Sequence, residues 1–227
     1  MKPMDIHGID YLGLERVLKR GSGETIGQED GALLVRDSIS GAYLLACEDA
    51  EAGRRLLEKH IGPEWSLLMV SDAALGREVY DRYGFSGKLE CYQAAYYGEK
   101  PPADGRITVR TAGEEDLPML TETYHLISPE ELEQVVRRKK LLIGYHGDQA
   151  VGFIGEHLEG SMGILYILPE FRHRGFGAAL QAHFIARTME EGYVPFGQVE
   201  KENHASLCLQ EKLGMTVSEN LIIWMWR

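Results

Sequence analysis

One segment in the second half of the chain constrains its fold more than any other. Within Leu165–Leu180 an apolar run stops at Pro169, Arg172 follows, and Gly175 and Gly177 open an apolar stretch of helical length. Proline cannot donate to a strand ladder, so we expect a strand to end there. Glycines let the backbone approach a ligand, and the first amides of a helix lack internal partners and attract anions. The segment therefore predicts a strand, a phosphate-binding loop and a helix.

Two other phosphate-binding loops do not fit this segment. A P-loop requires Gly-Lys-Ser/Thr after its second glycine, where Ala178-Ala179 stand instead. A dinucleotide-binding fingerprint requires a third glycine near Leu180, and its glycines directly follow the strand. The remaining alternative is a helix that starts with glycines and carries surface arginines without a ligand.

The residues around the loop resemble two consecutive motifs of a known family. The segment Arg172–Gly177, preceded by Leu168–Phe171, is similar to the coenzyme A pyrophosphate motif of the Gcn5-related N-acetyltransferases, the GNAT superfamily. Asn203–Ser206 followed by Glu211–Met215 resembles the motif that comes next in that superfamily. The resemblance spans about residues 106–227. Within the superfamily, this half looks most like the glycine N-acyltransferase branch.

The resemblance implies an acyl donor, acetyl-CoA, and a reaction, the direct attack of an amine on its thioester. It implies that the loop amides hold the pyrophosphate and that the strand end pairs with the pantetheine arm. It also implies that the Ile167 N–H faces the thioester carbonyl, where negative charge grows. The implied cofactor-binding residues are Ile167, Leu168, Arg172, His173, Arg174, Gly175, Phe176, Gly177, Ala178, Asn203 and Ser206.

The chain departs from the family pattern at Gln210. The family often has a tyrosine there, seven residues after the asparagine, as proton donor to the leaving thiolate. Glutamine cannot act as a general acid. A thiol pKa of about 8.5 makes the coenzyme A thiolate a tolerable leaving group, so the change weakens the mechanism without excluding it.

The proton of the attacking amine needs an acceptor, which matters more for a lysine than for an α-amino group. Deprotonation at pH 7 costs about 1 kcal/mol for an α-amino group and about 5 kcal/mol for a lysine. Glu156 is the first candidate, because a carboxylate late in an apolar strand is unexpected unless it faces a cleft; a solvated strand end is the alternative. Glu159 and Ser161 flank the next strand and come second, and we expect His157 to be a surface or capping residue.

The expected fold class is α/β (α+β), a GNAT-like mixed sheet with flanking helices after a smaller N-terminal α/β domain. A Pro/Gly-rich linker at 98–105 separates domains 1–100 and 106–227. The first domain is either a degenerate GNAT-like repeat or a chance likeness, because a helix, a glycine and a large apolar residue recur around Gly84 and Gly214.

The pattern predicts individual elements in the second half more clearly than in the first. Expected helices cover 111–126 from a Thr111 capping box, a segment starting at Ser128, 175–191 and 205–213, and expected strands cover 106–110, 141–145, 150–157, 161–168, 193–200 and 221–226. In the first half, strands at 42–46, 66–70 and 89–97 and helices at 50–60 and 75–83 are expected.

Composition narrows the partners. A net charge of −11 argues against nucleic acid and suits a cationic acceptor, so we expect a small-molecule amine. The absence of a long apolar run or secretory signal predicts no membrane association, and three scattered cysteines predict no metal site and a cytoplasmic setting. A homodimer stays open. Two alternatives to a small-molecule acyltransferase also stay open: a coenzyme A-binding sensor or structural module without catalysis, and a protein N-acetyltransferase.

Overall fold

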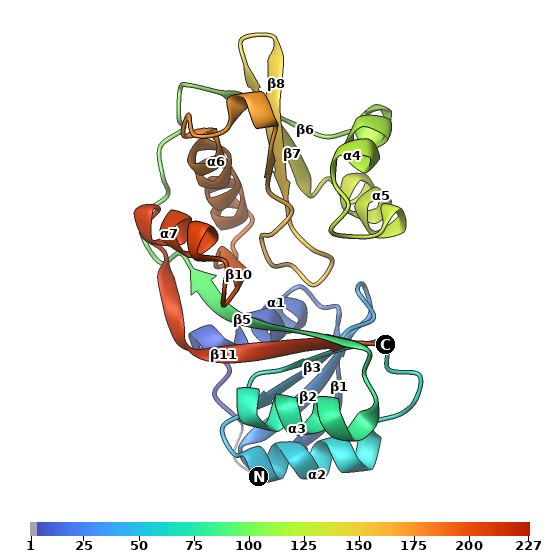
Figure 1. Cartoon of the computed structure of the whole chain (residues 1–227). Helices are drawn as coiled ribbons and strands as arrows, with labels where there is room; N and C mark the ends of the chain where they lie inside the picture. Colours follow the sequence, from blue (N-terminus) through green and yellow to red (C-terminus); the bar gives the residue numbers. More distant parts are fainter. Residues whose placement is uncertain (1–3) are drawn as a thin grey trace. The chain divides into compact units, whose positions relative to one another are not determined.

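The computed structural model describes residues 4–227, which form two compact units (Figure 1). Unit 1 comprises the residues up to Ala95 together with Gln198–Glu211 and Thr216–Arg227, and unit 2 comprises Tyr96–Gly197 with Lys212–Met215. The last part of the chain therefore contributes to both units. Residues 96–107, which include the predicted linker, contain no helix or strand, whereas the domain ranges 1–100 and 106–227 stay a prediction.

A seven-stranded sheet in the order β1-β2-β3-β4-β11-β5-β10 forms the centre of unit 1. Strands β3 and β4 run parallel and are joined by helix α2. The strands are β1 Gly23–Glu29, β2 Ala32–Asp37, β3 Tyr43–Cys47, β4 Leu67–Val70, β5 Gly87–Ala95, β10 Phe196–Glu200 and β11 Thr216–Trp226. The helices are η1 Ile9–Tyr11, α1 Leu12–Lys19, α2 Ala50–His60, α3 Ala73–Tyr83 and α7 His204–Lys212.

Both faces of this sheet are covered by helices, because successive side chains of a strand point to opposite faces. Leu34 packs into a buried cluster with residues of α2 and α3, whereas its neighbour Leu33 packs with residues of α1. Leu45 and Leu44 divide between the same two clusters. The apolar runs of β2 and β3 are therefore continuous, as expected of strands buried on both sides.

Helix α1 and the β1–β2 hairpin were not predicted. The hairpin turns at Asp30-Gly31, where Gly31 adopts a left-handed φ of 82° that suits glycine. Strand β1 lies at the edge of the sheet, and most of its residues are only partly buried. Because many of its residues are polar, β1 has no alternating apolar pattern from which a strand could be predicted.

Unit 2 has a four-stranded sheet in the order β6-β7-β8-β9, in which every neighbouring pair is antiparallel. Helices α4 and α5 cover one face through a cluster that includes Leu120, Val135 and Phe153 (Figure 1). Helix α6 packs on the other face, where Leu180 lies against Gly144 of β7. The elements are β6 Thr108–Thr111, η2 Glu114–Asp116, α4 Leu117–Thr123, α5 Pro129–Arg137, β7 Leu141–His146, β8 Gln149–Gly155, β9 Tyr166–Ile167, η3 Pro169–Phe171 and α6 Phe176–Glu190.

The predicted capping box at Thr111 is wrong, and the predicted helix 111–126 is shorter. Thr111 remains in β6, paired with Leu142, and the helical segment begins with a 3-10 turn at Glu114. The Asp116 carboxylate accepts the Gly113 N–H at 2.8 Å and two hydrogen bonds from Arg110. The acidic residue that fixes this turn is therefore Asp116.

The predicted strand 161–168 is also wrong in its bounds. Only Tyr166–Ile167 form a strand, and Met162 makes isolated bridges to Glu156 and to Gly197. The Leu165 N–H donates to the Gly163 carbonyl at 2.5 Å, so the backbone turns tightly at this point. The helix predicted to start at Ser128 is confirmed, since the Ser128 hydroxyl accepts the Glu131 N–H at 3.1 Å.

Asp37 at the end of β2 provides a test of the unit 1 fold. Burial by itself would raise the pKa of this fully enclosed carboxyl, but hydrogen bonds from Ser22 and Ser40 and the charge of Arg20 outweigh it and lower the pKa. A lowered pKa in the folded state gives stability that is present above the unfolded-state pKa and lost as pH falls.

We therefore expect Asp37→Asn to reduce the free energy of unfolding by about 2 kcal/mol at pH 7, because hydrogen bonds to a charged group are lost. The difference from wild type should shrink below about pH 4, where the unfolded carboxyl protonates. Urea denaturation at pH 7 and pH 3 measures both values. The exposed Asp81→Asn variant should match wild type at both. An Asp37→Asn deficit that is equal at the two pH values would contradict the charge-based account.

Candidate functional site

Strand β9 has a free backbone edge that follows from its pairing. It is the last strand of its sheet and is bonded to β8 on one side. The Leu168 N–H donates to the Val151 carbonyl at 3.0 Å, so Ile167 and Gly152 form a non-hydrogen-bonded pair. In such a pair the N–H and carbonyl point away from the partner strand. The Ile167 N–H therefore points to the open edge, as does its carbonyl, which accepts a 3.0 Å hydrogen bond from Arg172 Nε.

The segment before β9 meets β10 at one place. The Met162 N–H donates to the Phe196 carbonyl at 2.7 Å, and Met162 pairs in parallel with Gly197. Strand β9 itself pairs only with β8 among residues 4–227. The two parallel segments are thus joined near Met162 and no longer paired at Ile167, which leaves the strand edge open before the loop.

Gly152 permits the irregular pairing opposite β9. The register of β7 and β8 shifts between Gly144 and Tyr145, so β8 carries an extra residue next to Gly152. A Cβ atom on Gly152 would lie 2.2 Å from the Tyr166 carbonyl oxygen. No side chain fits there without displacing backbone, and the sequence gave no sign of this constraint.

The loop after β9 ends in an uncapped helix. Helix α6 starts after Gly175, which has a left-handed φ of 80° and no side chain to cap the first amides. His173 also has a positive φ of 60°, which is uncommon for a residue with a side chain. Alternating backbone conformations of this kind turn successive N–H groups toward one point and form an anion-binding concavity. The helix dipole adds to the same attraction.

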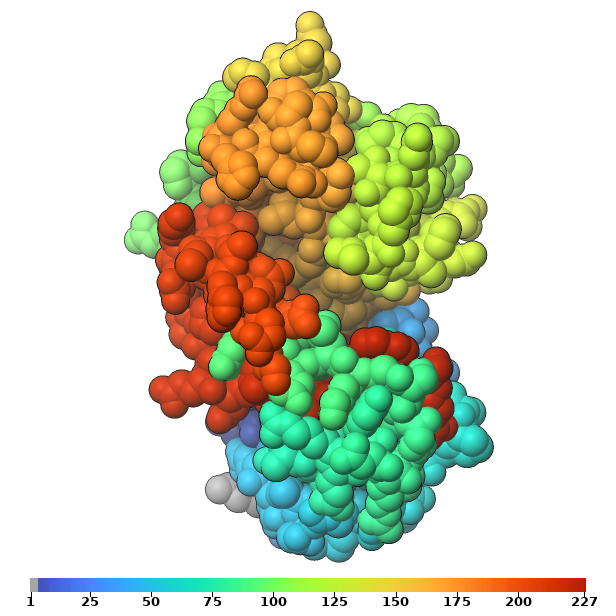
Figure 2. Space-filling view, viewed as in Figure 1, coloured from blue at the N-terminus to red at the C-terminus, as the bar shows by residue number. Residues whose placement is uncertain are grey.

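Two buried phenylalanines fix the ends of the loop. Phe171 and Phe176 contact each other edge to face at 6.1 Å between ring centroids, and the His146 ring lies 5.4 Å from Phe176. The residues between them, 172–175, are exposed. The segment around residues 165–180, drawn in orange in Figure 2, accordingly lies on the surface of unit 2. The packed rings therefore fix both ends of the loop, and the residues between them face solvent.

The charge on this loop is positive. Arg172 and Arg174 are exposed, and their guanidinium groups lie over the rings of Tyr166 and Phe171 at 5.5 and 5.7 Å. Arg106, which sequence analysis placed only in a strand, donates to the Arg174 carbonyl at 3.4 Å. Hydrogen bonds from Arg106 lower the pKa of Asp104 to about 2. Two guanidinium groups thus belong to the loop, and a third, that of Arg106, contacts it while paired with Asp104.

The predicted residues of the second motif lie in unit 1, at the start of α7. The Asn203 side-chain oxygen accepts the Ser206 N–H at 3.1 Å and caps the helix, so it already has a structural role. Gln210 is buried within the same helix. A role for Asn203 and Ser206 in cofactor binding stays a prediction.

Glu156 is buried and belongs to an ion-pair network. Only 3% of it is exposed, and its carboxylate lies 3.7 Å from Lys140 Nζ. Lys140 also pairs with Glu191, the C-cap residue directly after α6. The carboxylate is therefore directed to a lysine near the end of α6 and does not lie free in solvent.

Glu159 and Ser161 form a second buried pair next to Met162. The Ser161 hydroxyl donates to the Glu159 carboxylate, and both residues are at least nine-tenths buried. His157, expected at the surface, is part of the same group. Its Nδ1 lies 3.3 Å from the Glu131 carboxylate of α5, and a Cβ on Gly163 would lie 2.3 Å from its Nε2.

Neighbouring charges shift the pKa of His157. Burial lowers the pKa of the imidazole, but the hydrogen bond with Glu131 and the charges of Glu159 and Glu131 outweigh it and raise the pKa above its ordinary value. Sequence analysis missed this because Glu131 lies 26 residues away in the chain. An imidazole with a raised pKa therefore lies beside the two predicted candidates.

Metal-ligand clusters and membrane-spanning helices are both absent from the described part of the chain. Within residues 4–227, no group of three or more His, Cys, Asp or Glu side chains converges as metal ligands would. The helices of the same residues are all too short or too polar to cross a membrane.

Known proteins resemble this chain in fold. The family described as FR47-like protein matches residues 146–224. A Drosophila protein of known structure is similar with 18% identity and a TM-score of 0.71 over 98% of this chain and 91% of that one. A GCN5-related N-acetyltransferase-like protein from Streptococcus suis gives 16% identity and a TM-score of 0.57, over 95% and 92% of the two chains.

A GCN5-related N-acetyltransferase from Kribbella flavida gives 11% identity and a TM-score of 0.60, over 99% and 96% of the two chains. No curated protein matches the chain. At these identities the likeness concerns the fold. The mixed α/β architecture is that of the GNAT proteins, as predicted, and the similarity includes the residues of unit 1.

The two loop glycines should respond differently to alanine. Gly175→Ala forces a side chain into a left-handed conformation, where a Cβ would also lie 2.5 Å from Arg106 Nη1, so we expect a loss of about 1–2 kcal/mol of stability. Gly177→Ala places its Cβ at an ordinary 3.7 Å from Ile167 inside a helix, and should raise stability by up to about 1 kcal/mol. Urea denaturation of the two variants checks this order. Equal effects would mean that the loop backbone differs from the one described.

Proposed function

We propose that this chain is an acyl-CoA-dependent N-acyltransferase that transfers the acyl group, most favourably acetyl, to the primary amine of a small molecule or amino acid by direct attack. We also propose that the chain is most similar to the glycine N-acyltransferase branch, because of its loop and α7 motifs. We further propose a cytoplasmic setting, in which the three cysteines stay reduced. The negative net charge supports a cationic acceptor.

One observation carries the proposal: the Ile167 N–H points to an open strand edge that leads directly into an uncapped helix start. A strand edge can pair with an extended, amide-containing arm, and the helix start can hold a diphosphate. Acyl-CoA contains both groups, and its thioester supplies an electrophilic acyl carbon. The residues present fit such a donor.

In this proposal the residues of the loop have separate tasks. The amides at the start of α6, with Arg174, bind the diphosphate. Arg172 donates from Nε to the Ile167 carbonyl and so ties the loop to the strand edge. The Ile167 N–H donates a hydrogen bond where negative charge develops, and a main-chain donor in a fixed strand needs no reorganisation to do so.

For the proton acceptor we propose Glu159, with Ser161 as its hydrogen-bond partner, ahead of Glu156. The reason is the difference between the partners of the two carboxylates. Glu156 is paired with Lys140, whereas Glu159 is bonded to a neutral hydroxyl one residue from Met162, where the segment leading to β9 meets β10. Glu159 therefore lies beside the segment that leads to the open strand edge, whereas the Glu156 carboxylate is engaged by Lys140.

A coenzyme A-binding module without catalysis is the second candidate. The observation that favours it is Gln210, which is buried in α7 where the family often has a tyrosine. A protein N-terminus or lysine as acceptor keeps the same chemistry. Release of free thiol from acetyl-CoA with pooled small amines separates an enzyme from a binding module.

Binding of acetyl-CoA tests the loop directly. Gly177→Trp should fill the helix start and weaken the affinity for acetyl-CoA at least about tenfold, since the ring replaces the space next to the amides. Titration calorimetry measures the change. Gly105→Trp is the matched control, because nothing lies within 4 Å of a Cβ at Gly105. If both variants bind like wild type, the loop does not hold the cofactor.

Turnover tests the proton acceptor. Glu159→Gln should reduce kcat by about 100-fold or more at pH 7, the usual contribution of a general base, and leave the affinity for acetyl-CoA unchanged. The deficit should narrow at higher pH, where more of the amine is already neutral. Glu156→Gln is the matched comparison. A large loss in Glu156→Gln with normal activity in Glu159→Gln would reverse the assignment.

A further inference from the structure

His157 lies beside the proposed proton acceptor, and the proposed reaction assigns it no task. It follows Glu156 after β8, and its side chain is 29% exposed. Its Nδ1 atom lies 3.3 Å from a carboxylate oxygen of Glu131, the third residue of α5. The imidazole therefore joins the segment after β8 to the first turn of α5, two parts of unit 2 that are 26 residues apart in the chain.

The main chain of His157 closes the turn that carries Glu159. The His157 N–H donates to the Ser161 carbonyl at 2.8 Å, and the His157 carbonyl accepts the Gly160 N–H at 2.9 Å. Within this Glu159 turn, residues 157–161, the Ser161 hydroxyl donates to the Glu159 carboxylate. A displacement of His157 would therefore also displace the carboxylate that is proposed to accept the proton.

The imidazole ring also lies against the backbone that leads to β9. A Cβ atom on Gly163 would lie 2.3 Å from His157 Nε2 and 2.5 Å from its Cδ2, so a side chain at this position would displace the ring. The Gly163 N–H donates to the Gly155 carbonyl at 3.0 Å, which fixes the backbone next to the ring. The ring thus contacts α5 and the segment before the open strand edge, while its own main chain closes the Glu159 turn.

Two carboxylates face the imidazole and favour its charged form. They are Glu131 of α5 and Glu159 of the same turn, whereas residues 162–165 contribute no titratable side chain. Tyr124, the C-cap residue of α4, stays neutral, because burial and the charge of Glu131 raise its pKa to about 12. Burial lowers the pKa of His157, but the two carboxylates outweigh it and raise the pKa. The imidazole therefore keeps its charge to higher pH than in an unfolded chain.

We propose that His157 is a positioning residue, whose imidazolium holds the Glu159 turn to the first turn of α5. The inference rests on the proposed acyl transfer, in which Glu159 accepts the proton of the amine. It goes beyond that proposal, because it names the group that fixes the position of the acceptor and connects α5 with the reaction. No bond of either substrate is made or broken at His157.

The ion pair between His157 and Glu131 implies a limit to activity at high pH. Because the pKa of His157 is raised in the folded state, the ion pair is present at lower pH and is lost as pH rises through the folded-state pKa. The fraction of neutral amine increases as pH rises. We therefore expect kcat/KM to rise with pH and then to fall, with the falling limb at the titration midpoint of His157.

An NMR titration of the full chain measures the protonation of His157 without any substrate. Glu131→Gln removes the facing charge and keeps a side chain that suits the third position of α5, so the helix start is retained. We expect a lower titration midpoint for His157 in this variant, because the carboxylate no longer favours the charged imidazole. The resonance that disappears in His157→Gln identifies the residue.

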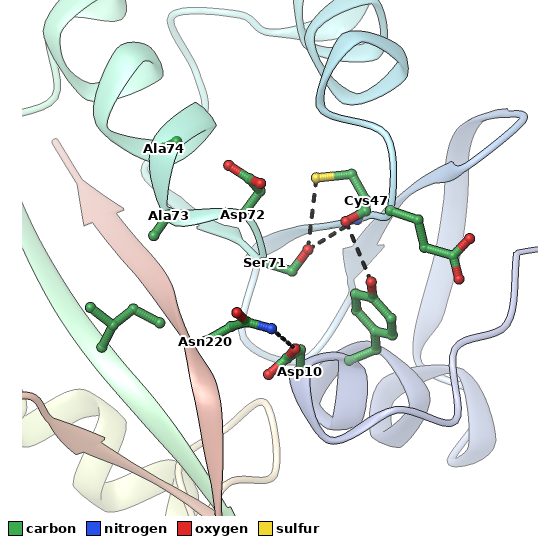
Figure 3. A pocket seen from close by; sticks show the side chains of 10 residues that line it. Asp10, Cys47, Ser71, Asp72, Ala73, Ala74 and Asn220 are labelled. Carbon is green, nitrogen blue, oxygen red and sulfur yellow. Dashed lines mark hydrogen bonds between the residues drawn. The ribbon is translucent and has the colours of Figure 1, made fainter.

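Two matched variants remove one carboxylate charge elsewhere. Glu133→Gln lies on the same helix, about 200° around its axis from Glu131. Asp72→Asn lies in unit 1, where Asp72 lines the pocket drawn in Figure 3 and asparagine still caps α3. Both variants should leave the midpoint of His157 at its wild-type value.

Hydrogen exchange and turnover test whether the ion pair positions the Glu159 turn. At one fixed pH below the wild-type midpoint, the amides of His157 and Gly160 should exchange about twofold or more faster in Glu131→Gln, since the turn opens more often. The falling limb of kcat/KM should move to lower pH together with the NMR midpoint. His157→Gln should lose this limb and at least about fivefold in kcat, with the calorimetric affinity for acetyl-CoA unchanged.

The outcomes separate the positioning role from the acyl-transfer proposal. The positioning role is overturned if Glu131→Gln leaves the midpoint of His157 unchanged, or if the midpoint moves while the exchange rates do not. Faster exchange with an unmoved falling limb assigns His157 to the fold alone and also overturns its role in the reaction. If the wild-type chain binds no acetyl-CoA, the acyl-transfer proposal is wrong, and the titration and exchange results still decide whether the ion pair holds the turn.

Discussion

The first main-chain N–H groups of α6 are not capped by any side chain, and the candidate site depends on these free donors. Gly175 supplies the left-handed turn, and because it has no side chain it leaves the first amides of the helix without a cap. Phe171 and Phe176 hold the two ends of this turn in the core. The exposed backbone between them is thus ordered by packing beneath it, and its N–H groups stay available to a ligand or to water. The open edge of β9 continues the same row of donors.

Adjacent residues after β8 enter two separate charge networks. Glu156 pairs with Lys140, which reaches Glu191 at the end of α6, whereas His157 meets Glu131 of α5. This follows from the alternation of side chains across a sheet that has α6 on one face and α4 and α5 on the other. The network on the α5 side includes Glu159 and Ser161, and its imidazole has a raised pKa. The two neighbouring side chains therefore belong to charge networks on opposite faces of the sheet.

Local signals made α6 predictable, whereas contacts between distant residues were not. Pro169 and the two loop glycines mark the strand end and the helix start within a few residues, so the structure matches the expectation closely. The apolar run 161–168 could not reveal that most of it lacks a ladder partner, because pairing depends on β10 and on the bulge beside Gly152. Edge strand β1 lacked an apolar pattern, and the contact of His157 with Glu131 joins two separate elements.

The two units differ in how a helix starts after a strand. In unit 2 the helix after β9 starts at a glycine, and arginines flank its free amides. In unit 1 the helices after β3 and β4 are capped by Asp49 and Asp72, each of which accepts one first-turn N–H. An aspartate at this position both stabilises the helix and repels an anion. The choice between glycine and aspartate at a helix start therefore decides whether its first amides stay open to an anion or are capped by a carboxylate.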